Sequence, residues 1–213
     1  PVRLFLPQKA LEHDVRVLAT ESRGIIIPVV VIPAGVFSGQ FIASEGDYLI
    51  RNPSLVGDQR TWTFSSWIKR GADTGTFQFI WSAGGEEYFG FMPSGRIRFL
   101  YNNFITALET VVLPVVTDFY HIVCRLDTTQ ALASDRVRMY INGNPATLLV
   151  SNNYPFINEE LSFNSLLQQN MGQDGIGNSF YLNGYMSDTH FIDGQSLPPS
   201  TFAETDGNSD YVP

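Results

Sequence analysis

Carboxylates are the first residues to consider for chemistry, because hydrolysis of a glycosidic bond uses two of them, held roughly 5–9.5 Å apart around one bond. Glu86 and Glu87 are adjacent in the sequence, so on a strand they would point to opposite faces of a sheet. Glu12 and Asp14 are two residues apart, but they lie in an N-terminal stretch that reads as separate from the main domain. The sequence therefore predicts no catalytic carboxylate pair, and a protein that is not an enzyme.

Histidines are the next candidates, because their charge changes near neutral pH and their ring nitrogens bind metals. The chain has three, at His13, His121 and His190. Asp188 and His190 would share one face of a strand, which is the arrangement of a metal-binding or acid/base pair. A hydrogen-bonded structural histidine is the favoured interpretation for His121 and His190, since both fall on predicted strands.

Aromatic and amide side chains in two loops have the composition of a sugar-binding site. Sugars are recognised by rings that stack on them and by amides that bind their hydroxyl groups. Polar turns beside core aromatics have the same composition, so both interpretations stay open. The candidate carbohydrate-binding residues are Tyr101, Asn102, Asn103, Asn152, Asn153 and Tyr154.

Charge argues against a nucleic-acid partner, and hydrophobicity argues against insertion into a membrane. The formal net charge is −8 and only 16% of the residues are charged. Lys and Arg are not clustered, so we expect no nucleic-acid partner. No run of about 18 apolar residues is present, so we expect no membrane insertion.

Cys124 is the only cysteine, and we expect it to be a small core residue.

Two strands must position many of these side chains. Apolar residues occupy every second position in Tyr120 to Leu126 and again in Val137 to Ile141, a period that predicts half-buried strands. Asn142-Gly143 favours a two-residue turn with positive φ, leading to a further strand over Ala146 to Val150. Similar short segments separated by Gly, Pro and Asn recur along the chain. The pattern predicts an all-β, two-sheet antiparallel jelly-roll sandwich in one domain, residues 35–213.

Residues 1–34 are predicted to form an extended arm outside this sandwich. Pro28 and Pro33 interrupt an uncharged β-branched run and remove N–H groups that a central strand needs. The run must be covered, either by the chain's own sandwich or by strand addition to a neighbouring subunit. We expect a homo-oligomer in which the arm packs on a neighbour. The candidate oligomerisation residues are Ile25, Ile26, Ile27, Val29, Val30, Val31 and Ile32.

Several blocks of the sequence resemble one known family. Tyr120-His121-Ile122-Val123 and Met139-Tyr140-Ile141-Asn142-Gly143 are similar to late strands of the laminin-G-like branch of the concanavalin A-like lectin/glucanase superfamily. Its opening pair of strands is similar to Gly46-Asp47-Tyr48-Leu49 and Trp62 to Arg70. Its closing strands are similar to Asn170-Met171-Gly172, Phe180 to Met186 and His190 to Leu197. The resemblance covers about Phe37 to Glu204, and it implies a lectin-like sandwich.

A narrower resemblance concerns structural proteins of tailed bacteriophages. Thr61 to Arg70, Asp127 to Ala133 and Phe191 to Glu204 are similar to them. This implies a non-enzymatic virion protein, assembled in the host cytoplasm, that serves as a tail fibre, spike or capsid decoration. Its partners would be other virion proteins, copies of itself, with a trimer favoured, and a host-surface glycan.

An alternative function and an alternative cofactor follow from the same superfamily. The alternative function is a carbohydrate-active enzyme or its carbohydrate-binding accessory module. The glucanases of the superfamily use Glu-x-Asp-x-x-Glu, and Val17 stands where Glu12-His13-Asp14 would need its second glutamate. Some laminin-G-like domains bind calcium through loop acids, which Asp127, Asp135 and Asp174 could supply. Their spacing favours solvated loop acids, so no cofactor is expected.

Overall fold

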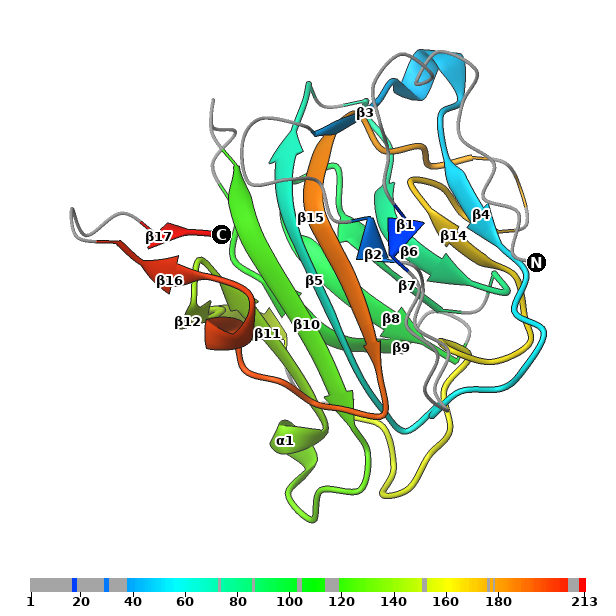
Figure 1. Ribbon diagram of the computed structural model, residues 1–213, viewed down its shortest axis with the longest axis vertical. Helices are drawn as coiled ribbons and strands as arrows, with labels where there is room; N and C mark the ends of the chain where they lie inside the picture. Colours follow the sequence, from blue (N-terminus) through cyan, green and yellow to red (C-terminus); the bar gives the residue numbers. More distant parts are fainter. Residues whose placement is uncertain are drawn as a thin grey trace.

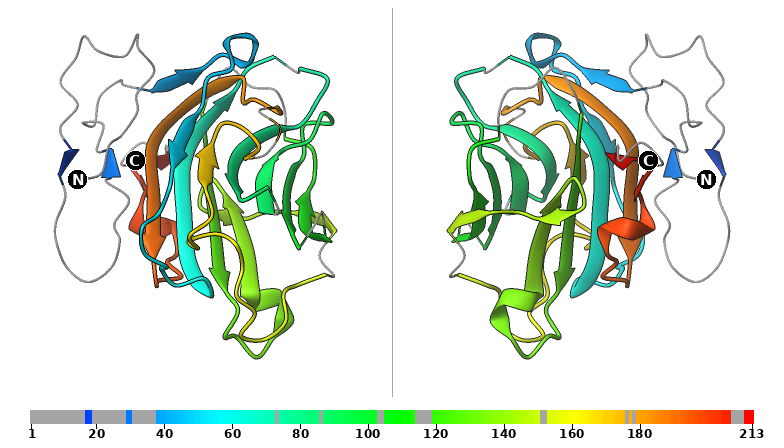
Figure 2. Two further views of the ribbon diagram at one scale, coloured as in Figure 1. Left: turned by 90° about the vertical axis from the view of Figure 1, so that its right-hand side faces the viewer. Right: turned by 90° about the vertical axis from the view of Figure 1, so that its left-hand side faces the viewer.

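The computed structural model describes residues 17–18, 29–30, 38–72, 74–85, 87–102, 105–113, 119–150, 153–175, 177, 179–206 and 211–213. Within these residues the protein is a sandwich of two antiparallel sheets, which face each other in Figures 1 and 2. The predicted all-β jelly-roll class is therefore confirmed. None of the helices among the described residues is long and apolar enough to cross a membrane.

One sheet of the described residues has six strands. In spatial order they are β12 (Asn144–Pro145), β11 (Val137–Ile141), β10 (Tyr120–Asp127), β5 (Thr61–Arg70), β15 (Gly184–Asp193) and β3 (Gly39–Phe41). The other sheet has seven strands. Its order is β13 (Leu148–Val150), β9 (Ile105–Thr110), β8 (Ile97–Tyr101), β7 (Glu87–Phe91), β6 (Gln78–Ala83), β14 (Gln169–Met171) and β4 (Leu49–Arg51).

Short elements complete the described chain. They are the strand pair β1 (Val17–Leu18) and β2 (Val29–Val30), the strand pair β16 (Glu204–Thr205) and β17 (Tyr211–Val212), the 3-10 turns η1 (Ala43–Glu45) and η2 (Pro199–Thr201), and the single helical turn α1 (Ala133–Arg136).

The turn between β11 and β12 forms as the sequence predicts. Asn142 and Gly143 have φ of 47° and 76°, and Ile141 pairs directly with Asn144. The strand expected over Ala146 to Val150 is shorter, because β13 covers only its last part. It also joins the other sheet, where Leu148 pairs with Thr110 of β9. The chain thus crosses between the two sheets at this point.

An aromatic core lies between the sheets. Trp62 and Phe64 of β5 are fully buried. The Trp62 ring packs edge to face on Phe163, with the ring centres 5.2 Å apart. The Phe64 ring packs in the same way on Phe89, with the ring centres 4.7 Å apart. Burial of each such side chain stabilises the fold by roughly 1.5–3 kcal/mol. Cys124 is also fully buried, in agreement with its predicted role as a small core residue.

The outer face of the six-stranded sheet is covered as well. The Thr63 hydroxyl donates to the carbonyl of Gln195 at 2.7 Å and accepts from the N–H of Leu197 at 2.8 Å. Figure 1 shows the chain after β15 continuing across β10 and β11 through η2 and β16. His121 and Val123, which point away from the core, are also fully buried.

The predicted arm is described only at β1 and β2. These two strands pair antiparallel, with Val17 opposite Val30 and Leu18 opposite Val29. β2 lies beside β15, on the outer side of the six-stranded sheet of its own chain (Figure 2). Val29 and Val30 are two of the predicted oligomerisation residues, and the structure describes only their backbone. The other predicted oligomerisation residues, Ile25, Ile26, Ile27, Val31 and Ile32, lie outside the described residues.

Candidate functional site

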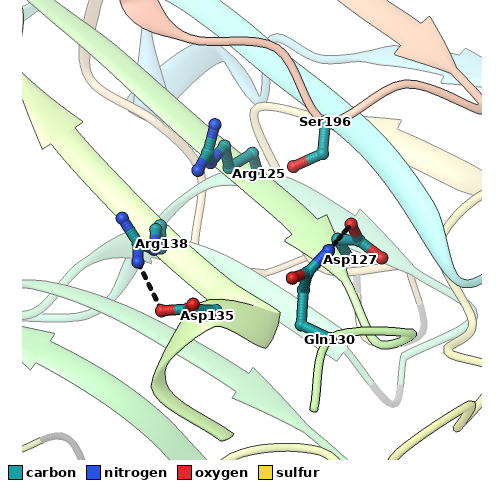
Figure 3. A pocket seen from close by; sticks show the side chains of 6 residues that line it. All are labelled: Arg125, Asp127, Gln130, Asp135, Arg138 and Ser196. Carbon is teal, nitrogen blue, oxygen red and sulfur yellow. Dashed lines mark hydrogen bonds and ion pairs between the residues drawn. The ribbon is translucent and has the colours of Figure 1, made fainter. Parts of the chain in front are cut away.

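A polar hollow of about 190 Å³ opens on the outer face of the six-stranded sheet. It is built where β10, β11 and α1 meet the segment that follows β15. The side chains that line it, all drawn in Figure 3, are Arg125, Asp127, Gln130, Asp135, Arg138 and Ser196.

Strand alternation turns two arginines toward this hollow. Cys124 and Leu126 of β10 point into the core, so Arg125 between them points outward. On β11, Val137 and Met139 point into the core, so Arg138 points outward too. The antiparallel register pairs Arg125 directly with Arg138. Two positive side chains therefore lie opposite each other on one face of the sheet.

The two acids of the hollow are both bound to neighbouring groups. Asp127 Oδ1 accepts from the N–H and the hydroxyl of Thr129, at 3.2 and 2.6 Å, and its Oδ2 accepts from the Gln130 amide at 2.6 Å. Asp135 forms an ion pair with Arg138. The hydrogen bond to Asp135, with a second one to Tyr140, raises the pKa of Arg138. Both acids therefore hold the walls of the hollow in place.

Among the residues that the structure describes, Arg125 differs from Arg138 in having no acidic partner. Its guanidinium lies over the ring of Tyr140, 5.5 Å from the ring centre. Its Nε is buried and has no hydrogen-bond partner, and none of the ion pairs between described residues includes this side chain. In Figure 3 the two guanidinium groups lie on the same side of the view, and Ser196 and Gln130 on the other. Arg125 thus brings to the hollow hydrogen-bond donors that no described residue uses.

The structure brings two of the three candidate calcium ligands together. Asp127 and Asp135 line the same hollow. Asp174 belongs to another loop, where it accepts from the N–H groups of Gly177 and Ser179 and from the Ser179 hydroxyl. No group of three or more His, Cys, Asp or Glu side chains suited to a metal ion occurs among the residues that the structure describes.

The two loops with candidate sugar-binding residues are joined through one acid. Glu159 accepts from the Asn102 amide at 2.6 Å with one oxygen, and from the N–H of Phe156 at 2.6 Å with the other. Burial, and then the charge of Glu159, raise the pKa of Tyr101.

The two candidate rings in these loops are buried to different degrees, whereas the ring of Phe156, in the second loop, is 79% exposed. Tyr101 is only 4% exposed, because alternation along β8 places it in the core. Of the two interpretations, a core aromatic beside a polar turn therefore applies to Tyr101, and its ring offers no face on which a sugar could stack. Tyr154 is partly buried against the same core, and Asn153 is exposed. Asn103 and Asn152 lie outside the described residues.

His121 is a buried structural residue, as the favoured interpretation predicted. Its Nε2 lies 2.8 Å from the Ser65 hydroxyl, and its ring stacks on Trp67 at 5.1 Å. Burial, and then the charge of His190, lower the pKa of His121 to about 4. Burial also lowers the pKa of His190, against the opposing charge of Asp188. Both rings therefore stay neutral at physiological pH.

Arg125, Arg138, Gln130 and Ser196 were not identified from the sequence. The outward direction of each arginine follows from the alternation of its own strand, so that signal was present. Their position opposite each other follows only from the register of β10 against β11. Ser196 comes from a segment about 70 residues further along the chain, and only the fold brings it to the hollow.

Comparisons with known proteins agree with this architecture. A search of curated proteins by sequence finds no match. Among solved structures, the native heptameric SAP-like pentraxin of Limulus polyphemus is 15% identical, with a TM-score of 0.52 over 74% of this chain and 76% of that one. Trypanosoma rangeli sialidase is 13% identical, with a TM-score of 0.52, over 80% of this chain but only 27% of the sialidase.

At these identities the two solved structures support the fold alone. The sequence itself gives the stronger result. A family model described as the concanavalin A-like lectin/glucanases superfamily matches residues 43–201, which lie within the range where the sequence resembles that family. The chain therefore belongs to the concanavalin A-like lectin/glucanases superfamily, as a laminin-G-like domain.

Proposed function

We propose that this chain is a non-enzymatic recognition protein that binds a saccharide in the hollow between β10, β11 and α1. The observation that carries the proposal is the lining of that hollow. Guanidinium, amide, hydroxyl and carboxylate groups converge there, and these are the groups that hydrogen-bond sugar hydroxyls. Arg125, Asp127 and Arg138 stand on two paired strands, whose backbone is already ordered before a ligand binds.

The state of the two acids supports binding rather than hydrolysis. A glycosidase needs one protonated carboxyl group and a second carboxylate that acts as base or nucleophile. Asp127 uses both oxygens to accept hydrogen bonds within its own loop, and Asp135 is held by Arg138. These contacts favour a positioning role for both acids.

The biological setting that we propose is a virus particle, as a tail-fibre, spike or capsid-decoration component of a tailed phage. The support is the resemblance of Thr61 to Arg70, Asp127 to Ala133 and Phe191 to Glu204 to phage structural proteins, together with the uncharged run in residues 25–32. Localising the chain in a reconstruction of the particle tests this part. Its absence from purified virions would refute it.

The arm is the proposed assembly element, with a homotrimer as the favoured state. Because β2 lies beside β15 of its own chain, exchange of the arm onto the same surface of a neighbouring subunit is the simplest assembly geometry. Deletion of residues 1–34 should leave a folded monomer, measured by circular dichroism and analytical ultracentrifugation. A full-length chain that sediments as a monomer at micromolar concentration would disprove the assembly role.

Saccharide binding is tested directly with the full-length chain on an array of neutral, carboxylated and sulfated glycans. Loss of one or two hydrogen bonds in Gln130→Ala or Ser196→Ala should weaken binding about 5- to 10-fold. Arg60→Gln is the matched control, because Arg60 lies outside the hollow and pairs with Glu160 at the surface. Turnover of a polysaccharide that Asp127→Asn or Asp135→Asn abolishes would instead support the enzyme alternative.

A further inference from the structure

The strongest unexplained feature of the hollow is the Arg125 side chain. Like charges directly opposite each other on a sheet destabilise it, and here Arg125 faces Arg138 across β10 and β11. Arg138 is neutralised by Asp135, whereas Arg125 has only the ring of Tyr140. A guanidinium carries five N–H donors, and no hydrogen bond or ion pair between described residues uses those of Arg125, whose Nε is buried. Asp127 and Asp135 are engaged elsewhere, so the described residues supply no anionic partner for Arg125.

We infer that the missing group is the carboxylate of an acidic saccharide, which Arg125 binds through its planar pair of N–H donors. This inference rests on the proposed function and names the ligand class for the same hollow. The guanidinium fork matches a carboxylate with two parallel hydrogen bonds. Stacking over Tyr140 holds the guanidinium plane before the ligand arrives, so that less freedom is lost on binding.

The remaining lining selects the charge and the polarity of that ligand. Asp127 and Asp135 lie in the same hollow, so a second negative charge on the ligand would be repelled. Polyanions such as nucleic acids are disfavoured for the same reason, and also by the net charge of −8. Gln130 and Ser196 provide neutral donors and acceptors suited to ring hydroxyls. A sugar with one carboxylate fits all of these groups.

The inference predicts a specific pattern among matched ligands. Three oligosaccharides of equal length are compared by isothermal titration with the full-length chain, ending in glucuronic acid, glucose or sulfated glucose. The glucuronic acid ligand should bind at least about 10-fold more tightly than the glucose ligand, because a charge-assisted bidentate contact exceeds a neutral hydrogen bond. Arg125→Gln should remove this preference, so that the glucose and glucuronic acid ligands bind with equal affinity. Arg125→Lys should retain part of it, because a lysine keeps the charge without the fork.

Stability separates a ligand-binding role from a structural one. Arg125→Gln removes one of two opposed positive charges and also the contact with the Tyr140 ring, two effects of opposite sign and similar size, so its melting temperature should stay close to that of the wild type. A clear fall in melting temperature would mean that Arg125 stabilises the sheet itself, and would overturn the inference. Arg60→Gln again serves as the control, with unchanged ligand preference.

The outcomes distinguish this inference from the function on which it rests. Equal binding of glucose and glucuronic acid ligands, insensitive to Arg125→Gln, overturns the inference and leaves saccharide binding intact. Preference for the sulfated ligand overturns the assignment of a carboxylate. Failure of all three ligands, and of the wider glycan array, refutes the proposed function as well.

Discussion

Lowering the pH below neutrality should destabilise this protein, and His121 should be a main cause. Its ring is fully buried between Ser65 and Trp67, and burial, followed by the charge of His190, lowers its pKa from 6.5 to about 4. In the unfolded chain the imidazole regains its ordinary pKa. Between pH 6.5 and 4 the unfolded state therefore binds more protons than the folded state, and the free energy of unfolding falls as the pH falls.

The size of the effect follows from the two pKa values. Each pH unit between 6.5 and 4 costs about 1.4 kcal/mol for a group that is protonated only in the unfolded state. Over the whole interval the loss is roughly 3 kcal/mol, a large fraction of the 5–15 kcal/mol typical of a folded domain. Above pH 6.5 the contribution is constant. His190, whose pKa is also lowered, adds a loss of the same sign.

Urea denaturation followed by tryptophan fluorescence, at pH values from 7 to 4, measures this dependence. His121→Gln should reduce stability most at pH 7, because it loses the Ser65 and Trp67 contacts. The difference from the wild type should shrink between pH 6.5 and 4, because the variant lacks the group that is protonated only in the unfolded state. His190→Gln is the matched control that separates the second histidine. Parallel curves for the wild type and His121→Gln would show that His121 is not buried in its neutral form, and the argument would fail.

Three further substitutions or modifications test the packing directly. Gly90→Ala places a methyl group 2.4 Å from the carbonyl oxygen of Gln78 and should cost about 1–3 kcal/mol in chemical denaturation, whereas Gly39→Ala, whose new atom has ordinary contacts, should be tolerated. Glu109→Gln should destabilise the protein by about 1–3 kcal/mol at pH 7 and by less at low pH. Burial alone would raise the pKa of Glu109, but its two arginine partners outweigh burial and lower the pKa. The stabilisation from this carboxylate is therefore lost as the pH falls through the lowered pKa. Equal losses of stability at both pH values would contradict the pairing. Cys124 is fully buried with a raised pKa, so iodoacetamide should label it only after unfolding, and rapid labelling of the native protein would contradict its burial.

Local patterns in the sequence were sufficient for the fold class and for much of its detail. Alternation of apolar residues along β10 and β11 assigns Cys124 to the core, because side chains of a strand point alternately to its two faces. The turn at Asn142-Gly143 follows from the positive φ that these residues tolerate. These features depend on neighbours within a few residues. For Tyr101 the sequence left open whether the ring is exposed or in the core, since nothing local indicates which face of a strand is covered, and the structure places it in the core.

The hollow was decided by tertiary structure. Arg125 meets Arg138 because β10 and β11 pair in one register among several that their alternation allows, and Ser196 joins them because β15 pairs with β5, more than 100 residues earlier in the chain. The sequence likewise predicts that His121 points away from the core, whereas its contacts with Ser65 and Trp67 depend on the pairing of β10 with β5. Side-chain direction along a strand is a local property of the backbone. Strand partners, register and the covering of an outer face depend on packing between distant segments, which no short stretch of sequence encodes.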